Sequence, residues 1–146
     1  MVLIPIEISS FIDGDSVKFL RNHQIITSRA RWIDCPEIDT GWGIKAKQFV
    51  ESLTENNELL IEEYGPDRYD RIEADWFIGS RKQNIQVELI LRGLAYCVPP
   101  SVQYNLSKRS SALLCKLIKS QTKAFHEKVG IWSDSNFILP NKRGMF

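Results

Sequence analysis

Apolar residues near the start of the chain come in short runs that turn residues interrupt. The runs over residues 2–11, 16–21 and 24–33 are rich in Ile, Val and Phe, and Asp13-Gly14-Asp15 and Asn22-His23 separate them. Asn, Asp and Gly favour tight turns, and β-branched and aromatic residues favour strands. The pattern predicts three consecutive antiparallel strands joined by short turns.

After the third run the period becomes that of a helix. Residues 43–55 carry Ala46, Phe49, Val50 and Leu53 at helical spacing, which predicts an amphipathic helix. Two more strands are expected next, then a short helix and a long one with a single apolar stripe: strands 59–64 and 71–78, helices 85–92 and 106–128, and the stripe Leu113, Leu114, Leu117, Ile118, Gln121, Ala124 and Phe125. This order predicts an α+β fold, mainly β: a five-stranded OB-type barrel with three packed helices, formed by residues 1–146 as a single domain.

Charge divides the chain into two unequal parts. The 146 residues include 19 Lys and Arg against 18 Asp and Glu, a net charge of +1. Residues 1–100 hold 11 basic against 16 acidic side chains, whereas residues 101–146 hold 8 against 2. The C-terminal segment is therefore basic, and residues 1–100 carry an excess of carboxylates that calls for a structural or functional explanation.

Other class-level features exclude several kinds of protein. No apolar run approaches the ~18 residues of a membrane span, so we expect no membrane association. The first residues lack the basic start and long apolar stretch of a signal peptide, which leaves the cytoplasm or the mature part of an exported protein. The three cysteines, Cys35, Cys97 and Cys115, are far apart and form no CxxC, so neither a zinc site nor a disulfide framework is expected.

Charged residues gather at three places where a predicted strand begins or ends. Asp13-Gly14-Asp15-Ser16 can present carboxylates to a hard cation, although the same residues also make ordinary turns. Arg29 through Glu37 places Arg29 and Arg31 on one face of a strand and follows them with Asp34, Pro36 and Glu37. This face is either exposed, with incidental ion pairs, or part of a site.

The third cluster is Asp67-Arg68-Tyr69-Asp70-Arg71, in the turn before the fifth strand. Alone it is typical of a solvated hairpin turn. Arginines on neighbouring strands that face acids at two strand ends, however, form a clamp for a phosphate beside a metal site. The combination favours phosphodiester chemistry.

These stretches resemble the staphylococcal nuclease-like (thermonuclease) family. The matching segments follow the family's order and spacing: Ile12 to Lys18, Arg29 to Glu37, Asp67 to Arg71, Gly93-Leu94-Ala95 and Gly130-Ile131-Trp132-Ser133. The resemblance covers about Phe11 to Trp132. It implies an OB barrel that carries a calcium-dependent nuclease, which hydrolyses phosphodiester bonds of DNA and RNA with little sequence preference and leaves 3′-phosphate ends.

The resemblance also assigns roles to particular residues. It implies that calcium (Ca²⁺) is held by the Asp15 and Asp34 carboxylates and the backbone carbonyl of Cys35. It implies that Glu37 positions or deprotonates the attacking water. It implies that Arg29 and Arg71 bind the scissile phosphate, and that Arg68 and Tyr69 lie near the terminal phosphate of the nucleotide.

The chain departs from the family pattern at several positions. Asp70 stands where the family usually has glycine, and Pro99 stands where some members have a base-stacking tyrosine, so Tyr96 or Tyr104 would have to replace it. The loop over residues 38–43 is also shorter than in the founding enzyme. These departures concern substrate affinity and base preference.

The expected function is therefore a metal-dependent endonuclease, acting as a monomer on single-stranded or unpaired DNA and RNA at the concave barrel face. The basic helix either steers the substrate or is a solvated face; its cations are Lys108, Arg109, Lys116, Lys119, Lys123 and Lys128. One alternative is a non-catalytic OB-fold module for nucleic-acid binding. Another is a protein-interaction module that uses the tryptophans Trp32, Trp42, Trp76 and Trp132.

Overall fold

A computed structural model describes residues 2–100 and 105–140 of the chain. Its elements are β1 (Ile4–Pro5), β2 (Glu7–Asp13), β3 (Ser16–Arg21), β4 (Gln24–Ala30), β5 (Ile33–Asp34), α1 (Gly41–Thr54), β6 (Leu59–Pro66), β7 (Ile72–Ile78), α2 (Ile85–Leu91), β8 (Tyr96–Cys97), α3 (Lys108–Glu127) and the 3₁₀ turn η1 (Gly130–Ser133). None of the helices within these residues is long and apolar enough to cross a membrane.

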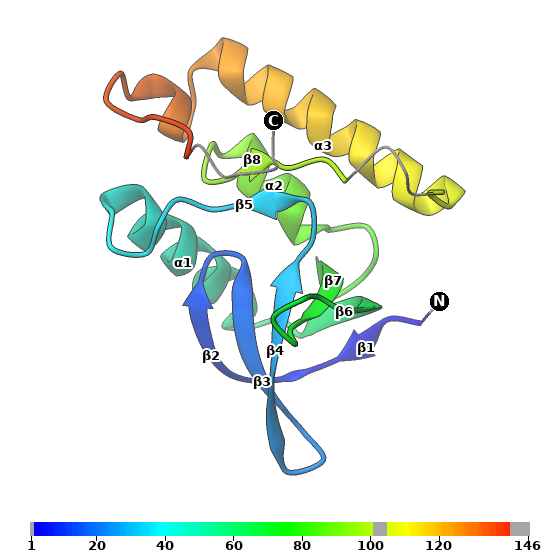
Figure 1. Ribbon diagram of the computed structural model, residues 1–146. Helices are drawn as coiled ribbons and strands as arrows, with labels where there is room; N and C mark the ends of the chain where they lie inside the picture. Colours follow the sequence, from blue (N-terminus) through cyan, green and yellow to red (C-terminus); the bar gives the residue numbers. More distant parts are fainter. Residues whose placement is uncertain (1, 101–104, 141–146) are drawn as a thin grey trace.

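Six strands form one curled sheet in the order β1-β6-β7-β4-β3-β2. Strands β2, β3 and β4 make the expected antiparallel meander, and β6 pairs with β7. The parallel pairing of β4 with β7 joins these two groups and sets Arg29 opposite Glu73. Figure 1 shows the three helices gathered on one side of the sheet, while the β3–β4 hairpin extends away from them. The expected α+β, OB-type architecture is confirmed.

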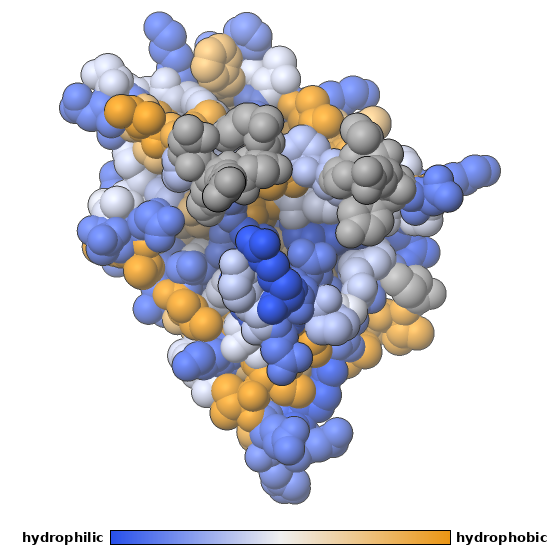
Figure 2. Space-filling view, viewed as in Figure 1, coloured by the Kyte–Doolittle hydropathy of each residue, from blue (hydrophilic) through white to orange (hydrophobic). Residues whose placement is uncertain are grey.

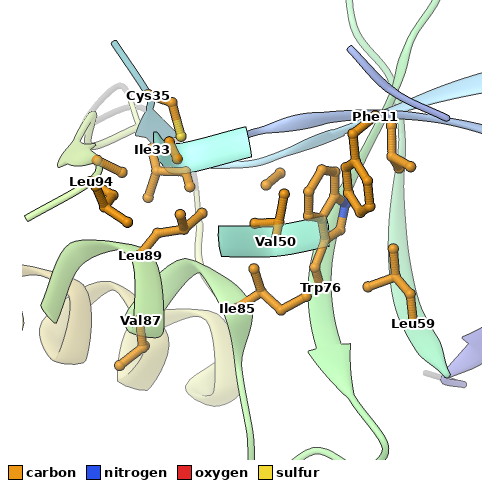
Figure 3. Packing of buried hydrophobic residues seen from close by; sticks show 14 of the residues in the cluster. Phe11, Ile33, Cys35, Val50, Leu59, Trp76, Ile85, Val87, Leu89 and Leu94 are labelled. Atoms are coloured by element: carbon orange, nitrogen blue, oxygen red, sulfur yellow. The ribbon is translucent and has the colours of Figure 1, made fainter. Parts of the chain in front are cut away.

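The core lies between this sheet and the helices. Trp76 of β7, Val50 of α1 and Leu89 of α2 are fully buried and meet in one cluster with Phe11 of β2 (Figure 3). Each helix begins at a polar residue whose side chain accepts a backbone N–H: Thr40 from Gly43, Asn84 from Val87 and Ser107 from Ser110. Such caps satisfy donors that have no partner within the helix, which explains where the three helices start.

The predicted apolar stripe of α3 is only partly correct. Leu117 and Ala124 are buried, whereas the side chains of Ile118 and Phe125 are 47% and 56% exposed. The buried face of α3 instead includes Ser110 and Ser120. Because α3 contacts the rest of the fold along a narrow face only, fewer apolar positions are buried than the periodicity indicates.

Gly93 and Gly130, which belong to two of the matching sequence motifs, lie against each other. A Cβ on Gly93 would be 2.1 Å from the carbonyl oxygen of Val129, and one on Gly130 would be 2.3 Å from the carbonyl oxygen of Gly93. Both residues have positive φ angles, and the N–H of Ile131 donates to the carbonyl of Gly93 over 2.9 Å. These glycines therefore hold the end of α2 against the turn after α3, a structural role.

Candidate active site

One cavity of about 780 Å³ collects every residue that the sequence assigned to a site. Its wall is formed by the β2–β3 turn, the end of β4, the segment from β5 to α1 and the β6–β7 connection. The predicted residues that line it are Asp15, Arg29, Asp34, Cys35, Glu37, Arg68, Tyr69 and Arg71. In the view of Figure 2, the centre of the face in front of the upper end of β4 is mainly hydrophilic. The fold thus brings segments that are far apart in sequence to one place.

Arg29 is the central group of the cavity. Its guanidinium pairs with the Asp34 carboxylate and lies 3.9 Å from Asp15 Oδ2. The same side chain donates to the carbonyls of Ala30 and Ile33 over 3.1 Å each. Burial opposes the charge of Arg29, but the carboxylates of Asp15, Asp34 and Glu73 raise its pKa overall, so it remains a cation.

Asp15 is a buried carboxylate whose partners only partly offset the cost of burying its charge. Its Oδ2 accepts the backbone N–H of Cys35 at 2.8 Å, and its own N–H donates to Asp13 Oδ1 at 3.0 Å, which fixes the turn. Burial, with a smaller contribution from Asp13, raises the pKa of Asp15 to about 7, although Arg29 and the Cys35 N–H act in the opposite direction. A second positive charge beside Asp15 would therefore be favourable.

The donor atoms around Asp15 suit a hard cation. Carboxylate and carbonyl oxygens of the kind that Asp15, Asp34 and Cys35 offer are ligands that Ca²⁺ and Mg²⁺ prefer. Among the residues that the structure describes, however, no three His, Cys, Asp or Glu side chains converge as a metal-binding group. Arg29 instead supplies positive charge between two of the carboxylates.

Cys35 takes part through its backbone. Burial and the neighbouring Asp15 raise the pKa of its thiol, so the sulfur stays protonated and is a poor nucleophile. Its side chain is buried against Gly14, where an added Cβ would lie 2.7 Å from Sγ. Cys35, Cys97 and Cys115 are all free thiols in the structure.

Glu37 lies on the exposed side of the cavity, in the loop before α1. Its backbone carbonyl accepts the Thr40 N–H at 3.0 Å and the Thr40 hydroxyl at 2.6 Å. Its carboxylate makes no hydrogen bond or ion pair with any residue in the described part of the chain. The side chain is held at the site through its backbone while its oxygens remain available to accept a proton.

Arg71 reaches the cavity from the β6–β7 connection, where Asp67 holds it. Asp67 accepts the backbone N–H groups of Tyr69 and Arg71 at 2.8 and 3.0 Å, and Arg71 Nε donates to its Oδ2 at 2.8 Å. Burial opposes ionisation, but these three donors lower the pKa of Asp67 overall. Tyr69 is 64% exposed, and Arg68 and Arg71 lie 5.0 and 5.2 Å from the centre of its ring.

The roles of three acidic residues were not predicted from the sequence. Asp13 fixes the Asp15 turn, Asp67 anchors Arg71, and Glu73 lies opposite Arg29 across the β4–β7 pairing. Glu73 alternates with Arg71 along the strand, so its position on the same face could have been noticed. Asp13 was interpreted as a possible cation ligand or as part of an ordinary turn, and Asp67 as part of a turn; their anchoring roles depend on the folded backbone.

The structure also tests the expected replacements for a stacking tyrosine. The Tyr96 ring is 3% exposed and lies opposite Asp34 in the β5–β8 pair, so it cannot stack on a base from solution. Its hydroxyl is buried without a hydrogen-bond partner among the described residues, and burial followed by the charges of Asp34 and Asp15 raises its pKa. Tyr104, the other expected replacement, lies outside the described residues.

The curled sheet with three helices on one side is an OB-type fold of the staphylococcal nuclease kind. The chain belongs to that family, because residues 28–134 match the family model described as "Staphylococcal nuclease homologue".

The alignments with named relatives cover most of the chain. A "Micrococcal nuclease" of Shigella flexneri is 29% identical over 143 residues, which cover 93% of this chain and 78% of the relative. An "Uncharacterized endonuclease" of Haemophilus influenzae is 28% identical over 131 residues, covering 89% and 67% of the two chains. "Protein ParB" of Escherichia coli is 25% identical over 143 residues, covering 93% and 76%. The family and the two nuclease names support nuclease activity in general.

Proposed function

We propose that this protein is a calcium-dependent nuclease that hydrolyses phosphodiester bonds of single-stranded or unpaired DNA and RNA and leaves 3′-phosphate ends. One observation carries the proposal: a single cavity holds a partly buried arginine between two carboxylates, a second anchored arginine, and a glutamate whose carboxylate has no partner among the described residues. A phosphodiester is an anion, so its hydrolysis needs positive charge at the phosphoryl oxygens and a group that accepts a proton from water.

We assign each residue a role from the family resemblance and from its place in the cavity. Asp15, Asp34 and the carbonyl of Cys35 would hold the calcium ion, which when bound neutralises charge on the phosphate. Arg29 and Arg71 present planar guanidinium groups that donate two parallel hydrogen bonds to phosphate oxygens. Glu37 accepts or orients the proton of the attacking water, because its carboxylate has no competing partner in the described structure.

Arg68 and Tyr69 extend the site along the substrate. Both are exposed on the β6–β7 connection and line the same cavity as Arg29. A guanidinium and a phenol can donate to a neighbouring phosphate of the strand. We assign them to substrate binding and expect them to influence the Michaelis constant more than turnover.

A digestion assay tests the function. Single- and double-stranded DNA and RNA are incubated side by side with the protein and calcium, and the same reactions are repeated with EDTA and with other divalent ions. The proposal expects fragments of denatured DNA and of RNA only when calcium is present. Binding without cleavage over a range of metals and pH would show a non-catalytic nucleic-acid-binding module instead.

A further inference from the structure

The loop that carries Glu37 has no buried side chain of its own. Residues 37–41 are all exposed, and within the described part of the chain their hydrogen bonds reach no further than the first turn of α1. The Thr40 N–H and hydroxyl donate to the carbonyl of Glu37, and the N–H of Gly43 donates to the Thr40 hydroxyl. The position of the proposed proton acceptor therefore depends on what holds this first turn in place.

One side chain of the first turn, Trp42, reaches a distant part of the chain. Its indole Nε1 donates to Asp134 Oδ2 at 2.8 Å, although the two residues are 92 positions apart. The ring is half-buried against the core, and the ammonium of Lys45 lies 4.6 Å from its centre. In Figure 1, the turn that follows α3 lies at the same end of the molecule as the start of α1. The bond thus ties the beginning of α1 to the C-terminal turn.

Asp134 is itself fixed on a rigid support. Its N–H donates to the carbonyl of Ile131 at 3.3 Å, and its Oδ1 accepts the N–H of Asn136 at 2.9 Å. Ile131 is 1% exposed, and its N–H donates to the carbonyl of Gly93, just after α2. The bonds from Trp42 and Asn136 lower the pKa of Asp134, so its carboxylate is ionised at neutral pH and is a stronger acceptor.

Gly43 connects Trp42 to the loop before the helix. It follows Trp42 directly, and its Cα lies so close to the loop that an added Cβ would be 1.9 Å from the carbonyl oxygen of Glu37. A shift of the Trp42 backbone therefore displaces Glu37, because close-packed backbone atoms leave no space to absorb it. The series of contacts from Asp134 through Trp42 and Gly43 ends at the residue that accepts the proton in the proposed reaction.

We propose that the hydrogen bond between Trp42 and Asp134 is a positioning contact of the nuclease, which sets the Glu37 carboxylate against the attacking water. The inference rests on the proposed function, because it takes Glu37 to be the proton acceptor. In the described structure neither Trp42 nor Asp134 lines the cavity of the proposed active site, so both act through the loop. The residues assigned to calcium and phosphate precede this loop or lie on other segments, and their binding should be independent of the bond.

Steady-state kinetics and binding measurements test the proposal. Trp42→Phe and Asp134→Ala remove the donor and the acceptor in turn, and each should lower turnover on denatured DNA about tenfold, because a small misplacement of a reacting group is costly. The double variant should be no slower than the slower single variant, because both changes break the same bond. The dissociation constants of calcium and of a single strand, the latter measured in EDTA, should stay within about twofold of the parent's.

Two comparisons separate positioning from a general loss of structure. Asp134→Asn keeps an acceptor oxygen and should turn over faster than Asp134→Ala, whereas Ser135→Ala, at the exposed neighbouring residue, should keep the parent's rate. In a Glu37→Gln background, Trp42→Phe should lower the residual rate by less than about twofold, since the group that it positions is already absent. Thermal unfolding of each variant checks that it is folded.

Amide hydrogen exchange gives a readout that does not need activity. Trp42→Phe should speed exchange at least about tenfold at the N–H groups of Thr40, Gly43 and Ile44, which bond within the loop and the first turn, and leave the amides of β4 unchanged. The inference is overturned if these amides exchange as in the parent, if turnover is unchanged, or if Trp42→Phe slows the Glu37→Gln variant as much as it slows the parent. Failure of the proposed function gives a different result: the parent cleaves no polymer with calcium, while exchange still shows whether the bond holds the loop.

Discussion

The guanidinium of Arg29 lies between two carboxylates, paired with Asp34 and 3.9 Å from Asp15. The proposed phosphate-binding group and the proposed calcium ligands therefore interact directly before either ligand binds. A cation at these carboxylates and the guanidinium repel each other, while both attract a phosphate. This arrangement makes calcium binding and turnover respond in opposite directions to the loss of Arg29.

Arg29→Gln is predicted to tighten calcium binding several-fold while it lowers turnover about 10²–10³-fold, because it removes a competing cation and a phosphate donor together. Calorimetric titration with calcium and initial rates on denatured DNA measure the two effects. Arg21→Gln is the control, since Arg21 pairs with Glu63 elsewhere on the barrel. Weaker calcium binding in Arg29→Gln would show that the guanidinium supports the cation site.

Asp15 should make the metal-free protein less stable as the pH rises. Its folded-state pKa of about 7 lies above its ordinary value of 3.8, so ionisation costs stability progressively between these values. In EDTA, Asp15→Asn is predicted to exceed the parent in unfolding free energy by roughly 1–3 kcal/mol at pH 8. The difference should disappear towards pH 4. Denaturant unfolding measures it, and a constant difference across this range would contradict the burial of an under-compensated charge.

Gly43 fixes the position of Glu37. A Cβ at Gly43 would lie 1.9 Å from the carbonyl oxygen of Glu37, so Gly43→Ala must displace the loop that carries this residue. We predict a loss of about 1–3 kcal/mol in stability and at least a tenfold drop in turnover. Gly41→Ala is the matched control in the same helical turn, because nothing lies within 4 Å of its added Cβ. Comparable turnover in both variants would exclude this role for Gly43.

Asp70 adds an acid beside Arg71 at a position where the backbone suits glycine. Its φ is +61°, which Asp tolerates and Gly adopts freely. Asp70→Gly is predicted to lower the Michaelis constant a few-fold at low salt and leave turnover unchanged, because one repulsion of the substrate is removed. Steady-state rates at two salt concentrations measure this effect, with Glu51→Gln on α1 as a charge-matched control. An equal effect in both variants would indicate net charge alone.

Local pattern predicted most of the fold. Turn residues such as Asn22-His23, which take φ angles of +50° and +64°, marked the β3–β4 hairpin correctly. The parallel pairing of β4 with β7 and the pairing of β1 with β6 were not predicted, because strand partners distant in sequence leave no local pattern. The third strand also ends earlier than expected. It ends at Ala30, because Trp32 takes a φ of +66° and breaks the extended chain.

The candidate site was predictable as a set of residues, and its geometry was not. Motif order indicated which acids and arginines belong together, and all of them line one cavity. The surroundings of Arg31 could not be predicted from the sequence pattern. Its alternation with Arg29 placed both on one face, yet only the fold brings it to Asp75, 44 residues away, and buries the pair.

The most direct test of the proposed active site is the mass of the products made from a defined single-stranded oligonucleotide. With calcium, the parent protein should give fragments that end in 3′-phosphate. Glu37→Gln should give the same fragments at least about a hundredfold more slowly, since it removes the proton acceptor while the fold remains unchanged. Fragments that end in 3′-hydroxyl, no cleavage by the parent, or an unchanged rate in Glu37→Gln would contradict the account.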